Sequence, residues 1–483
     1  MSTFFLGFDI GTLSSKGVLV DQEGNVVAHK QLKHNILIPK AGYQEQDSEL
    51  WWEEFKLMVK FFLSLPNVKA KDIKSIGLTG CVPALSSIDS QGKTIGNAIM
   101  HTDVRAEKQL KFINGQLDLP ITHGFMLPKI LWVKENDPER YKKTAKVLVP
   151  HGFIGYKLTG NPTIDYDTAC IIGGVFNPAK LEWDSQKIKQ FGIREDILPT
   201  PCPASQVIGN VLPQVAEETG LTTETLVIAG TGDSFASILG GGAFDRNHLM
   251  LCLGTSGTII YANCPPRELI SSYHFGPGKA EFIGRILSCG ESMNHIRETF
   301  QYHWWDELNE GGSKVSLGSE GLFFIPHYKQ QSEESFFGLD AEFIYGYRSK
   351  HSQFHLYRAL IEGIAYNIKS NLLNFDKPID QINIVGGAAN SELIREIISN
   401  VLNYPLTFYP NNSTAVGVAF LAGYCSGYIS DFNHISKIWF TERIKVKPDP
   451  LKVQKYKDLY QVYAELKQNV EKIDELLYSK NNL

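Results

Sequence analysis

The feature that most constrains this chain is a pattern that occurs twice, about half of its 483 residues apart. Near the N-terminus, the apolar run Phe4–Ile10 leads into the sequence GTLSSK at Gly11–Lys16. Further on, Leu249–Leu253 leads into GTSGT at Gly254–Thr258. Each copy predicts a buried strand, a tight turn with free backbone N–H groups and hydroxyls, and a second β-rich segment. Two such turns can hold a polyphosphate from both sides, which predicts a nucleotide-using enzyme with its site between two similar halves.

Composition and charge limit the class of protein further. The net charge of −5 and the pI near 6.2 give no sign of a surface that binds nucleic acid. No run approaches the roughly 18 apolar residues of a membrane span, and no signal peptide is recognisable. The seven cysteines are scattered without metal-binding spacing, which suits a reducing compartment. We expect a cytoplasmic enzyme that binds neither nucleic acid nor membranes; a homodimer is compatible with these features.

Strands alternate with helical segments along the chain, which predicts an α/β architecture. The small and apolar segment Thr414–Gly423 is expected to be a helix that packs closely against a sheet. We place the boundary between the two halves near residue 247, which gives lobes at 1–247 and 248–483. The expected strands are Phe4–Ile10, Gly17–Leu19, Val26–Gln31, Ile73–Leu78, Leu226–Ala229, Leu249–Leu253 and Ile382–Val385, and further helices are expected after Asp47 and Asp137 and at Phe354–Asn371, Glu392–Leu402 and Leu451–Tyr478.

Two aspartates directly follow or end a strand and are candidates for chemistry. Asp9 precedes the first glycine turn, where a carboxylate can bind Mg²⁺ together with phosphate oxygens or can cap its own turn. Ser15, Lys16 and the second copy of the turn favour the functional interpretation. Asp233 lies between a glycine and an expected helix. It is either the N-cap of that helix or a general base that takes a proton from a substrate hydroxyl, and the spacing alone leaves both open.

Other motifs also allow two interpretations. The sequence GGA at Gly386–Ala388 can be a close helix–sheet contact, or a surface for an adenine ring with Asn390 beside it. It is not a dinucleotide fingerprint, and the chain has no Walker-type phosphate loop. Asp103 and Arg105 can bind polyol hydroxyls or form a surface ion pair of little energetic value, and the residues alone favour the ion pair. His151 and the pair Trp304 and Trp305 are interpreted as packing or surface residues.

Taken together, these motifs resemble the FGGY family of carbohydrate kinases, and within it most closely the xylulokinases. The resemblance runs from about residue 4 to 425. It implies the two-lobed actin/hexokinase-like (ribonuclease H-like) fold, with a mixed five-stranded sheet and surrounding helices in each lobe, sugar and catalytic base in the first lobe and ATP in the second. The matching segments are Asp9–Lys16, Gly230–Asp233, Leu253–Gly257 and Val385–Asn390, with His101–Arg105, Pro128–Trp132 and Arg358–Gly363 as further segments.

The resemblance also implies a reaction. ATP and Mg²⁺ would serve to phosphorylate a primary hydroxyl of a small ketose or polyol, with D-xylulose as the first candidate and ribulose, fuculose or erythritol as alternatives. Asp233 matches the catalytic base and Asp9 the Mg²⁺-linked carboxylate. The residues implied for ATP are Gly11, Thr12, Lys16, Gly254, Thr255, Gly386, Gly387 and Asn390, and those implied for the sugar are Cys81, Val82, Asp103 and Asp233.

Departures from the family pattern leave the sugar open. The sequence GCVP at Gly80–Pro83 stands where xylulokinases have Gly-Gln-Met-His, so the sugar contact of the Met-His pair is not carried over. Asn400 and Asn412 replace acidic residues of relatives, and His327–Phe337 lacks the usual Gly-Glu-Arg-x-Pro pattern. Two other function classes are an actin/Hsp70-like ATPase without a sugar substrate and a sugar-sensing pseudokinase. The first is disfavoured because the two halves take up nearly all of the chain, the second because Asp9 and Asp233 are intact.

Overall fold

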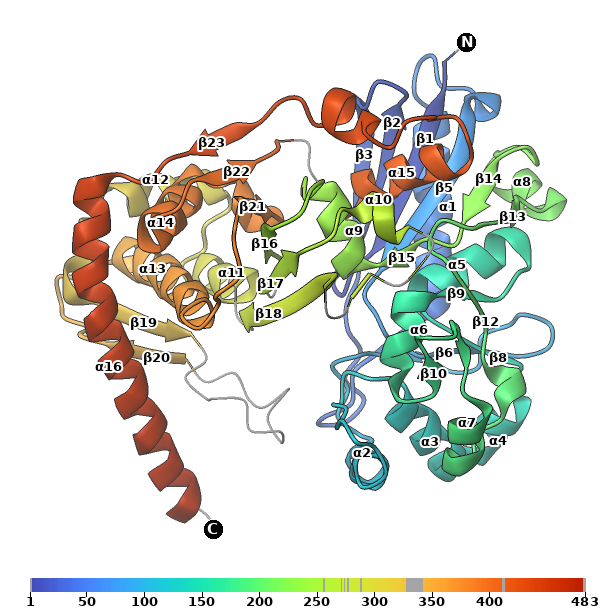
Figure 1. Cartoon of the computed structure of the whole chain (residues 1–483), viewed down its shortest axis with the longest axis horizontal. Helices are drawn as coiled ribbons and strands as arrows, with labels where there is room; N and C mark the ends of the chain where they lie inside the picture. Colours follow the sequence, from blue (N-terminus) through green and yellow to red (C-terminus); the bar gives the residue numbers. More distant parts are fainter. Residues whose placement is uncertain are drawn as a thin grey trace. The chain divides into compact units, whose positions relative to one another are not determined.

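The computed structural model divides into two compact units, each built on one mixed β-sheet (Figure 1). Unit 1 comprises Met1–Gly242, Pro266–Phe275 and Ser413–Thr441, and unit 2 comprises Ala243–Pro265, Gly276–Asn412 and Glu442–Leu483. The structure describes residues 2–254, 257–270, 272, 274–275, 278–286, 289–326, 342–410 and 413–480. The α/β fold class expected from the sequence is confirmed. Within the described residues, no helix combines the length and apolar character needed to cross a bilayer.

The sheet of unit 1 begins with an antiparallel meander of three strands, β1, β2 and β3. β5 then lies parallel to β1, and β14 lies parallel to β5. The strands, in spatial order, are β13 (Val207–Asn210), β14 (Leu226–Ile228), β5 (Ile73–Gly80), β1 (Phe4–Ile10), β2 (Ser14–Asp21) and β3 (Val26–Lys33), and β15 (Thr231–Gly232) pairs with the end of β5. The strands expected in this part of the chain are confirmed.

The sheet of unit 2 repeats this plan. β16, β17 and β18 form an antiparallel meander, β21 lies parallel to β16, and β22 lies parallel to β21. The duplicated sequence pattern is therefore a duplicated structure. Each sheet holds the five strands that the resemblance implied and additional short ones, β13 and β15 in unit 1 and β23 in unit 2. In spatial order the strands are β18 (Ala280–Ile286), β17 (Gly257–Ala262), β16 (His248–Leu253), β21 (Gln381–Val385), β22 (Leu406–Phe408) and β23 (Ile444–Val446).

Helices and short two-stranded ladders complete unit 1. The expected helix after Asp47 is α1, and the Asp47 side chain caps it by accepting from the N–H of Glu49. The helices are α1 (Ser48–Leu63), α2 (Glu107–Asn114), α3 (Leu127–Asn136), α4 (Pro138–Lys143), α5 (Pro150–Thr159), α6 (Tyr166–Gly173), α7 (Ser185–Phe191), α8 (Pro213–Thr219), α9 (Asp233–Gly240), α10 (Pro266–Leu269) and α15 (Thr414–Cys425). The ladders pair β4 (Glu45–Gln46) with β7 (Ala98–Ile99), β6 (Ser86–Ile88) with β8 (Lys146–Leu148), β9 (Thr163–Asp165) with β12 (Thr200–Cys202), and β10 (Phe176–Asn177) with β11 (Glu182–Trp183).

Helix α15 comes from the later part of the chain but packs on the sheet of unit 1. A Cβ atom added to Gly7 in β1 would lie 1.9 Å from the carbonyl oxygen of Ala415, and one added to Gly77 in β5 would lie 1.9 Å from that of Val418. The backbone of α15 can reach the sheet only because these strand positions have no side chain. The expected close helix–sheet packing is confirmed, and the compact units do not follow a single cut near residue 247.

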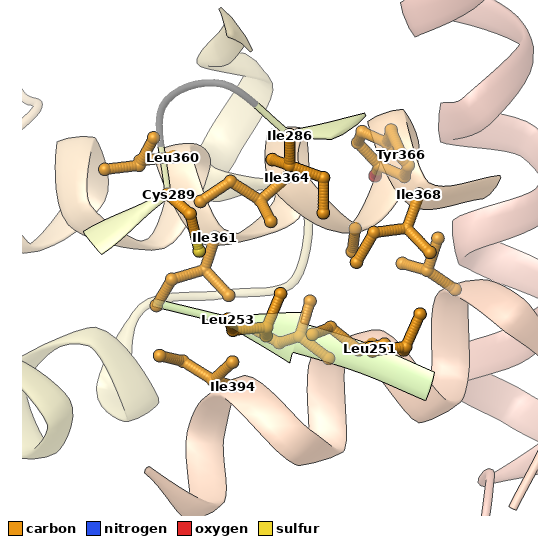
Figure 2. Close-up of a cluster of buried hydrophobic side chains, with 14 of the residues drawn as sticks. Leu251, Leu253, Ile286, Cys289, Leu360, Ile361, Ile364, Tyr366, Ile368 and Ile394 are labelled. Carbon is orange, nitrogen blue, oxygen red and sulfur yellow. The ribbon is translucent and has the colours of Figure 1, made fainter. Parts of the chain in front are cut away.

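The core of unit 2 joins its sheet to its helices. Figure 2 shows Leu251 and Leu253 of β16 in one apolar cluster with Ile361 and Ile364 of α13 and Ile394 of α14. These helices carry the apolar spacing seen in the sequence, and all three helices expected in this unit are confirmed. The helices of unit 2 are α11 (Gly290–Thr299), α12 (Trp305–Lys314), α13 (Gln353–Asn371), α14 (Glu392–Leu402) and α16 (Pro450–Lys480), and the hairpin is β19 (Phe323–Pro326) with β20 (Glu342–Tyr345).

Candidate active site

Three neighbouring strands of unit 1 end at the candidate active site. β5 pairs in parallel with both β1 and β15. Asp9 is the last residue but one of β1, Cys81 directly follows β5, and Asp233 directly follows β15. Because parallel strands end at the same edge of a sheet, the fold brings these three side chains together.

The thiol of Cys81 shows how closely these groups converge. Burial raises the pKa of this thiol far above its usual value, and the negative charges of Asp233 and Asp9 raise it further, Asp233 more than Asp9. The hydroxyl of Thr12 hydrogen-bonds to the same thiol. Charges shift a neighbouring pKa in this way only at short range. Both carboxylates and Thr12 of the first glycine turn therefore lie near one buried side chain, although they come from separate parts of the sequence.

Asp9 is a buried carboxylate with a defined partner. One of its oxygens accepts a hydrogen bond of 2.5 Å from the hydroxyl of Thr414, the first residue of α15. Burial raises the pKa of Asp9, while the charge of Lys16 and the Thr414 hydrogen bond act in the opposite direction. A desolvated carboxylate oxygen is the donor that Mg²⁺ prefers, and a cation beside it would offset the cost of burial. Asp9 therefore fits a Mg²⁺ ion that arrives with phosphate oxygens.

Asp233 is the first residue of α9 and is half-buried. The N-cap of this helix is Gly232, and no side chain caps it. The interpretation of Asp233 as an N-cap is therefore wrong, because the helix begins one residue earlier than the sequence suggested. Asp233 thus follows the end of β15 directly, in the first turn of α9, at the edge of the sheet where β1 and β5 also end.

Val82 packs against the glycine that precedes Asp233. A Cβ atom added to Gly232 would lie 2.6 Å from a methyl carbon of Val82, so the two residues are in direct contact. Gly232 immediately precedes Asp233 in the chain. The segment of Cys81 and Val82 therefore lies next to the segment that carries the candidate base.

Asp103 and Arg105 form a buried ion pair. Asp103 is only 1% exposed, and its oxygens accept from the backbone N–H and the guanidinium of Arg105 and from the backbone N–H of Gln44. The guanidinium of Arg105 lies over the rings of Tyr43 and Trp132, 3.9 and 4.9 Å from their centroids. The interpretation as a surface pair is wrong, because these rings enclose it. Protein donors occupy the carboxylate of Asp103, which fixes the segment that carries Gln44.

Lys129 is a fully buried lysine beside this pair; the sequence placed it in the matching segment Pro128–Trp132 but gave it no role of its own. Its ammonium group donates to the backbone carbonyls of His101, His123 and Phe125. Burial lowers the pKa of Lys129 to about 7; the charge of Asp103 opposes this shift and that of Arg105 adds to it. Lys129 therefore ties the segment that contains Asp103 to the turn before α3.

Replacing Lys129 by Met is expected to destabilise the protein more at about pH 8.5 than at pH 7. In the unfolded chain the lysine keeps its proton up to its ordinary pKa of 10.5, whereas the folded chain releases it near pH 7. The free energy of unfolding of the unaltered protein therefore rises with pH in this window, by up to about 1.4 kcal/mol per pH unit, and the variant lacks this contribution. Urea unfolding at both pH values measures it; an equal difference at the two pH values would contradict the lowered pKa.

The glycine turns of unit 2 lie at the corresponding edge of its own sheet. β16 and β21 run parallel, so Gly254 and Gly386 directly follow neighbouring strand ends. Gly386 has a φ of 104°, and a Cβ atom there would lie 2.3 Å from the carbonyl oxygen of Leu253. The two turns therefore approach each other at a distance that only glycine allows.

Gly387 leaves open space at the same edge. A Cβ atom added there would meet no atom within 4 Å. The Asn390 side chain donates to the carbonyl of Gly387 at 3.2 Å, and the guanidinium of Arg395 donates to the carbonyls of Ala389 and Asn390. The backbone at Gly387 therefore has no side chain on its open side, and Arg395 stabilises the residues that follow it. Such a surface can accept a flat ring. Arg395 is a supporting residue that the sequence did not indicate.

Several residues that the sequence analysis named lie outside this site or outside the described residues. Thr255, Asn412 and His327–Phe337 lie outside the described residues. The side chain of Asn400 is buried and accepts from the backbone N–H of Asp449, so it anchors the chain just before α16. His151 is buried and paired with Asp165, which agrees with its interpretation as a packing residue.

Comparisons with known proteins show the family of this chain. The sequence profile of the FGGY family of carbohydrate kinases, N-terminal domain, matches residues 4–240, and that of the C-terminal domain matches residues 249–426. The chain is similar to the xylulose kinase of Bacillus subtilis (29% identity, 96% of each chain) and to that of Lactococcus lactis (28%, 99% of each). A solved structure of xylulose kinase from Lactobacillus acidophilus shares the fold, with a TM-score of 0.79 at 24% identity over 97% of this chain and 98% of that one.

Proposed function

This chain belongs to the FGGY family of carbohydrate kinases, and from that membership we propose that it transfers the terminal phosphoryl group of ATP to a primary hydroxyl of a small ketose or polyol, with D-xylulose as the first candidate. The observation that carries the proposal is the parallel pairing of β1, β5 and β15, whose ends bring Asp9, Cys81 and Asp233 to one edge of the sheet, next to the turn that contains Thr12. A base, a carboxylate suited to a cation and a phosphate-binding turn are the parts that phosphoryl transfer requires.

In the proposed reaction, Asp233 takes the proton from the acceptor hydroxyl as that oxygen attacks the terminal phosphorus in line. The bond between this phosphorus and the bridging oxygen breaks, and ADP leaves. The backbone N–H of Thr12 and those that follow it in the turn hold phosphate oxygens, while the N–H of Gly11 closes the turn by donating to the carbonyl of Ser14 at 2.9 Å. Asp9, with Lys16 beside it, would hold Mg²⁺, which supplies positive charge to the phosphate oxygens when bound.

Unit 2 supplies the proposed nucleotide-binding residues. We assign phosphate contacts to Gly254 and Thr255 and the adenosine side to Gly386, Gly387 and Asn390. Support comes from the open space at Gly387 and from the close approach of Gly386 to the end of β16. In this proposal, the residues for the sugar and the base belong to unit 1, and those for the adenosine belong to unit 2.

The names of the similar xylulose kinases support D-xylulose as the substrate. The residues near Asp233 determine which chemical groups the sugar would meet there. Cys81 and Val82 offer a thiol of raised pKa and a methyl group rather than a charged or amide side chain. We assign Asp103 to the sugar-binding part of the site, where it accepts from the backbone N–H of Gln44 and so fixes that residue. The Gln44 side chain in turn accepts from the Thr102 hydroxyl. We include a cytoplasmic location and a homodimeric assembly in the proposal.

A panel of sugars tests the proposal. The purified protein is mixed with ATP and Mg²⁺, and ADP release is followed with D-xylulose, L-xylulose, ribulose, fuculose, erythritol, pentitols or no sugar. We expect release that depends on one sugar or a small group of them, with D-xylulose among the best. Equal ATP turnover with and without every sugar would contradict the proposal, and stimulation by unfolded peptides instead would favour a chaperone-like ATPase.

A further inference from the structure

The turn at Gly11–Ser14, called here the phosphate turn, is held from behind by buried side chains. The carbonyl of Gly11 lies 3.0 Å from Nε2 of His34, and the carbonyl of Thr12 accepts from Nε2 of Gln46 at 2.5 Å. The carbonyl of Leu13 accepts from the backbone N–H of His34 at 3.1 Å. Three successive carbonyls of the turn therefore point into the protein.

The direction of these carbonyls fixes the direction of the N–H groups. In a planar trans peptide, the N–H of one residue points opposite to the carbonyl of the residue before it. The N–H groups of Thr12, Leu13 and Ser14 consequently point away from His34 and Gln46. Successive N–H groups that point the same way form a concavity that binds anions such as phosphate.

His34 is itself braced by a carboxylate. Its Nδ1 lies 3.1 Å from both side-chain oxygens of Glu54, and both residues are buried. A carboxylate and a backbone carbonyl are both acceptors, so the His34 ring lies between two acceptors that orient it. Glu54 lies on α1, and Trp51, one turn earlier on that helix, donates to the Gln46 side chain at 2.9 Å. One face of α1 thus supports the whole turn.

We propose that His34, oriented by Glu54, is a positioning residue for the phosphates of the nucleotide. It touches no substrate; it acts by aiming the N–H groups of the phosphate turn toward the phosphate oxygens. The inference deepens the proposed function and rests on it, because it concerns the phosphate-binding part of the same site. A purely structural role for the His34–Glu54 pair would instead change stability without a selective effect on nucleotide binding.

Replacing His34 by Phe tests this role, because the ring keeps its approximate shape and loses both donors. ATP affinity is measured by titration calorimetry, and the KM for sugar by steady-state kinetics. We expect ATP binding to weaken about tenfold or more, as for loss of a charge-assisted hydrogen bond, while the KM for sugar changes by less than about twofold. The matched control is His151→Phe, which removes another buried His–carboxylate pair of this unit, 2.9 Å from Asp165, and is expected to keep its ATP affinity.

Unchanged ATP affinity in a folded His34→Phe protein would overturn the inference, as would an equal loss in His151→Phe. If His34→Phe does not fold, Glu54→Gln keeps an acceptor for Nδ1 and removes the charge, and it should weaken ATP binding selectively; unchanged ATP affinity there would also overturn the inference. The proposed function and this inference can be refuted independently. If the unaltered protein binds ATP but phosphorylates no sugar, the proposed function is refuted. If the protein phosphorylates a sugar but its ATP affinity does not change in His34→Phe, only this inference is refuted.

Discussion

Replacing Asp233 by Asn is expected to lower kcat for sugar phosphorylation by about 10²–10⁴-fold, the usual loss when a general base is removed. Asn has nearly the same shape as Asp but cannot take the hydroxyl proton. The fold should survive, because the N-cap of α9 is Gly232 and the helix start does not depend on the Asp233 side chain. Steady-state kinetics at saturating ATP and sugar measure the effect.

The matched control for this variant is Asp196→Asn. Asp196 lies in the same unit, its side chain is largely exposed, and its partner is the surface residue Arg194. The control should keep nearly full activity, and Asp233→Asn should still bind ATP. Near-full turnover by a correctly folded Asp233→Asn protein would rule out its role as the base.

Replacing Arg358 by Met is expected to destabilise the protein by about 3–5 kcal/mol, because it leaves the Glu362 carboxylate buried without its counter-charge. Arg358 donates to Glu362 at 2.9 Å and to the hydroxyl of Tyr456 on α16. Glu362 also accepts from the backbone N–H of Gly318 and the hydroxyl of Ser319. The network joins α13 to α16, and urea or thermal unfolding measures its loss.

The pH dependence identifies the cause of this destabilisation. Burial already raises the pKa of Glu362, and the charge of Arg358 opposes that shift. Without Arg358 the folded state holds its proton to a higher pH than the unfolded chain does, so the stability of the variant falls as pH rises. The loss should be larger at pH 8 than at pH 5. The double variant Arg358→Met with Glu362→Gln should recover part of it, and no recovery would mean that lost packing, not the buried charge, dominates.

The sequence predicted most elements because the local signals were strong. A few neighbouring residues were enough to predict each of three elements: the apolar run of β1 with its Gly-Thr turn, the cap of α1 at Asp47, and the apolar spacing of α14. The repeated Gly-Thr pattern also predicted the duplicated sheets, since the same local design demands the same strand pairing.

What the sequence did not reveal depends on contacts between distant segments. The residues Thr414–Gly423 alone do not indicate that this helix packs on the sheet of unit 1, because the packing depends on glycines in β1 and β5. The burial of Asp103 likewise depends on Tyr43 and Trp132, which come from two other segments. The supports His34 and Lys129 were missed for the same reason, since a buried polar residue shows its role only when its partners are placed.

Phosphorus NMR of the reaction mixture tests the central claim most directly. With the unaltered protein, ATP, Mg²⁺ and D-xylulose, we predict a new phosphomonoester signal coupled to a CH₂ group, as a primary hydroxyl requires, that grows as ATP is converted to ADP. Asp233→Asn should produce this signal only at a greatly reduced rate. Conversion of ATP to ADP with inorganic phosphate as the only new phosphorus signal besides those of ADP, whichever sugar of the panel is present, would contradict the account.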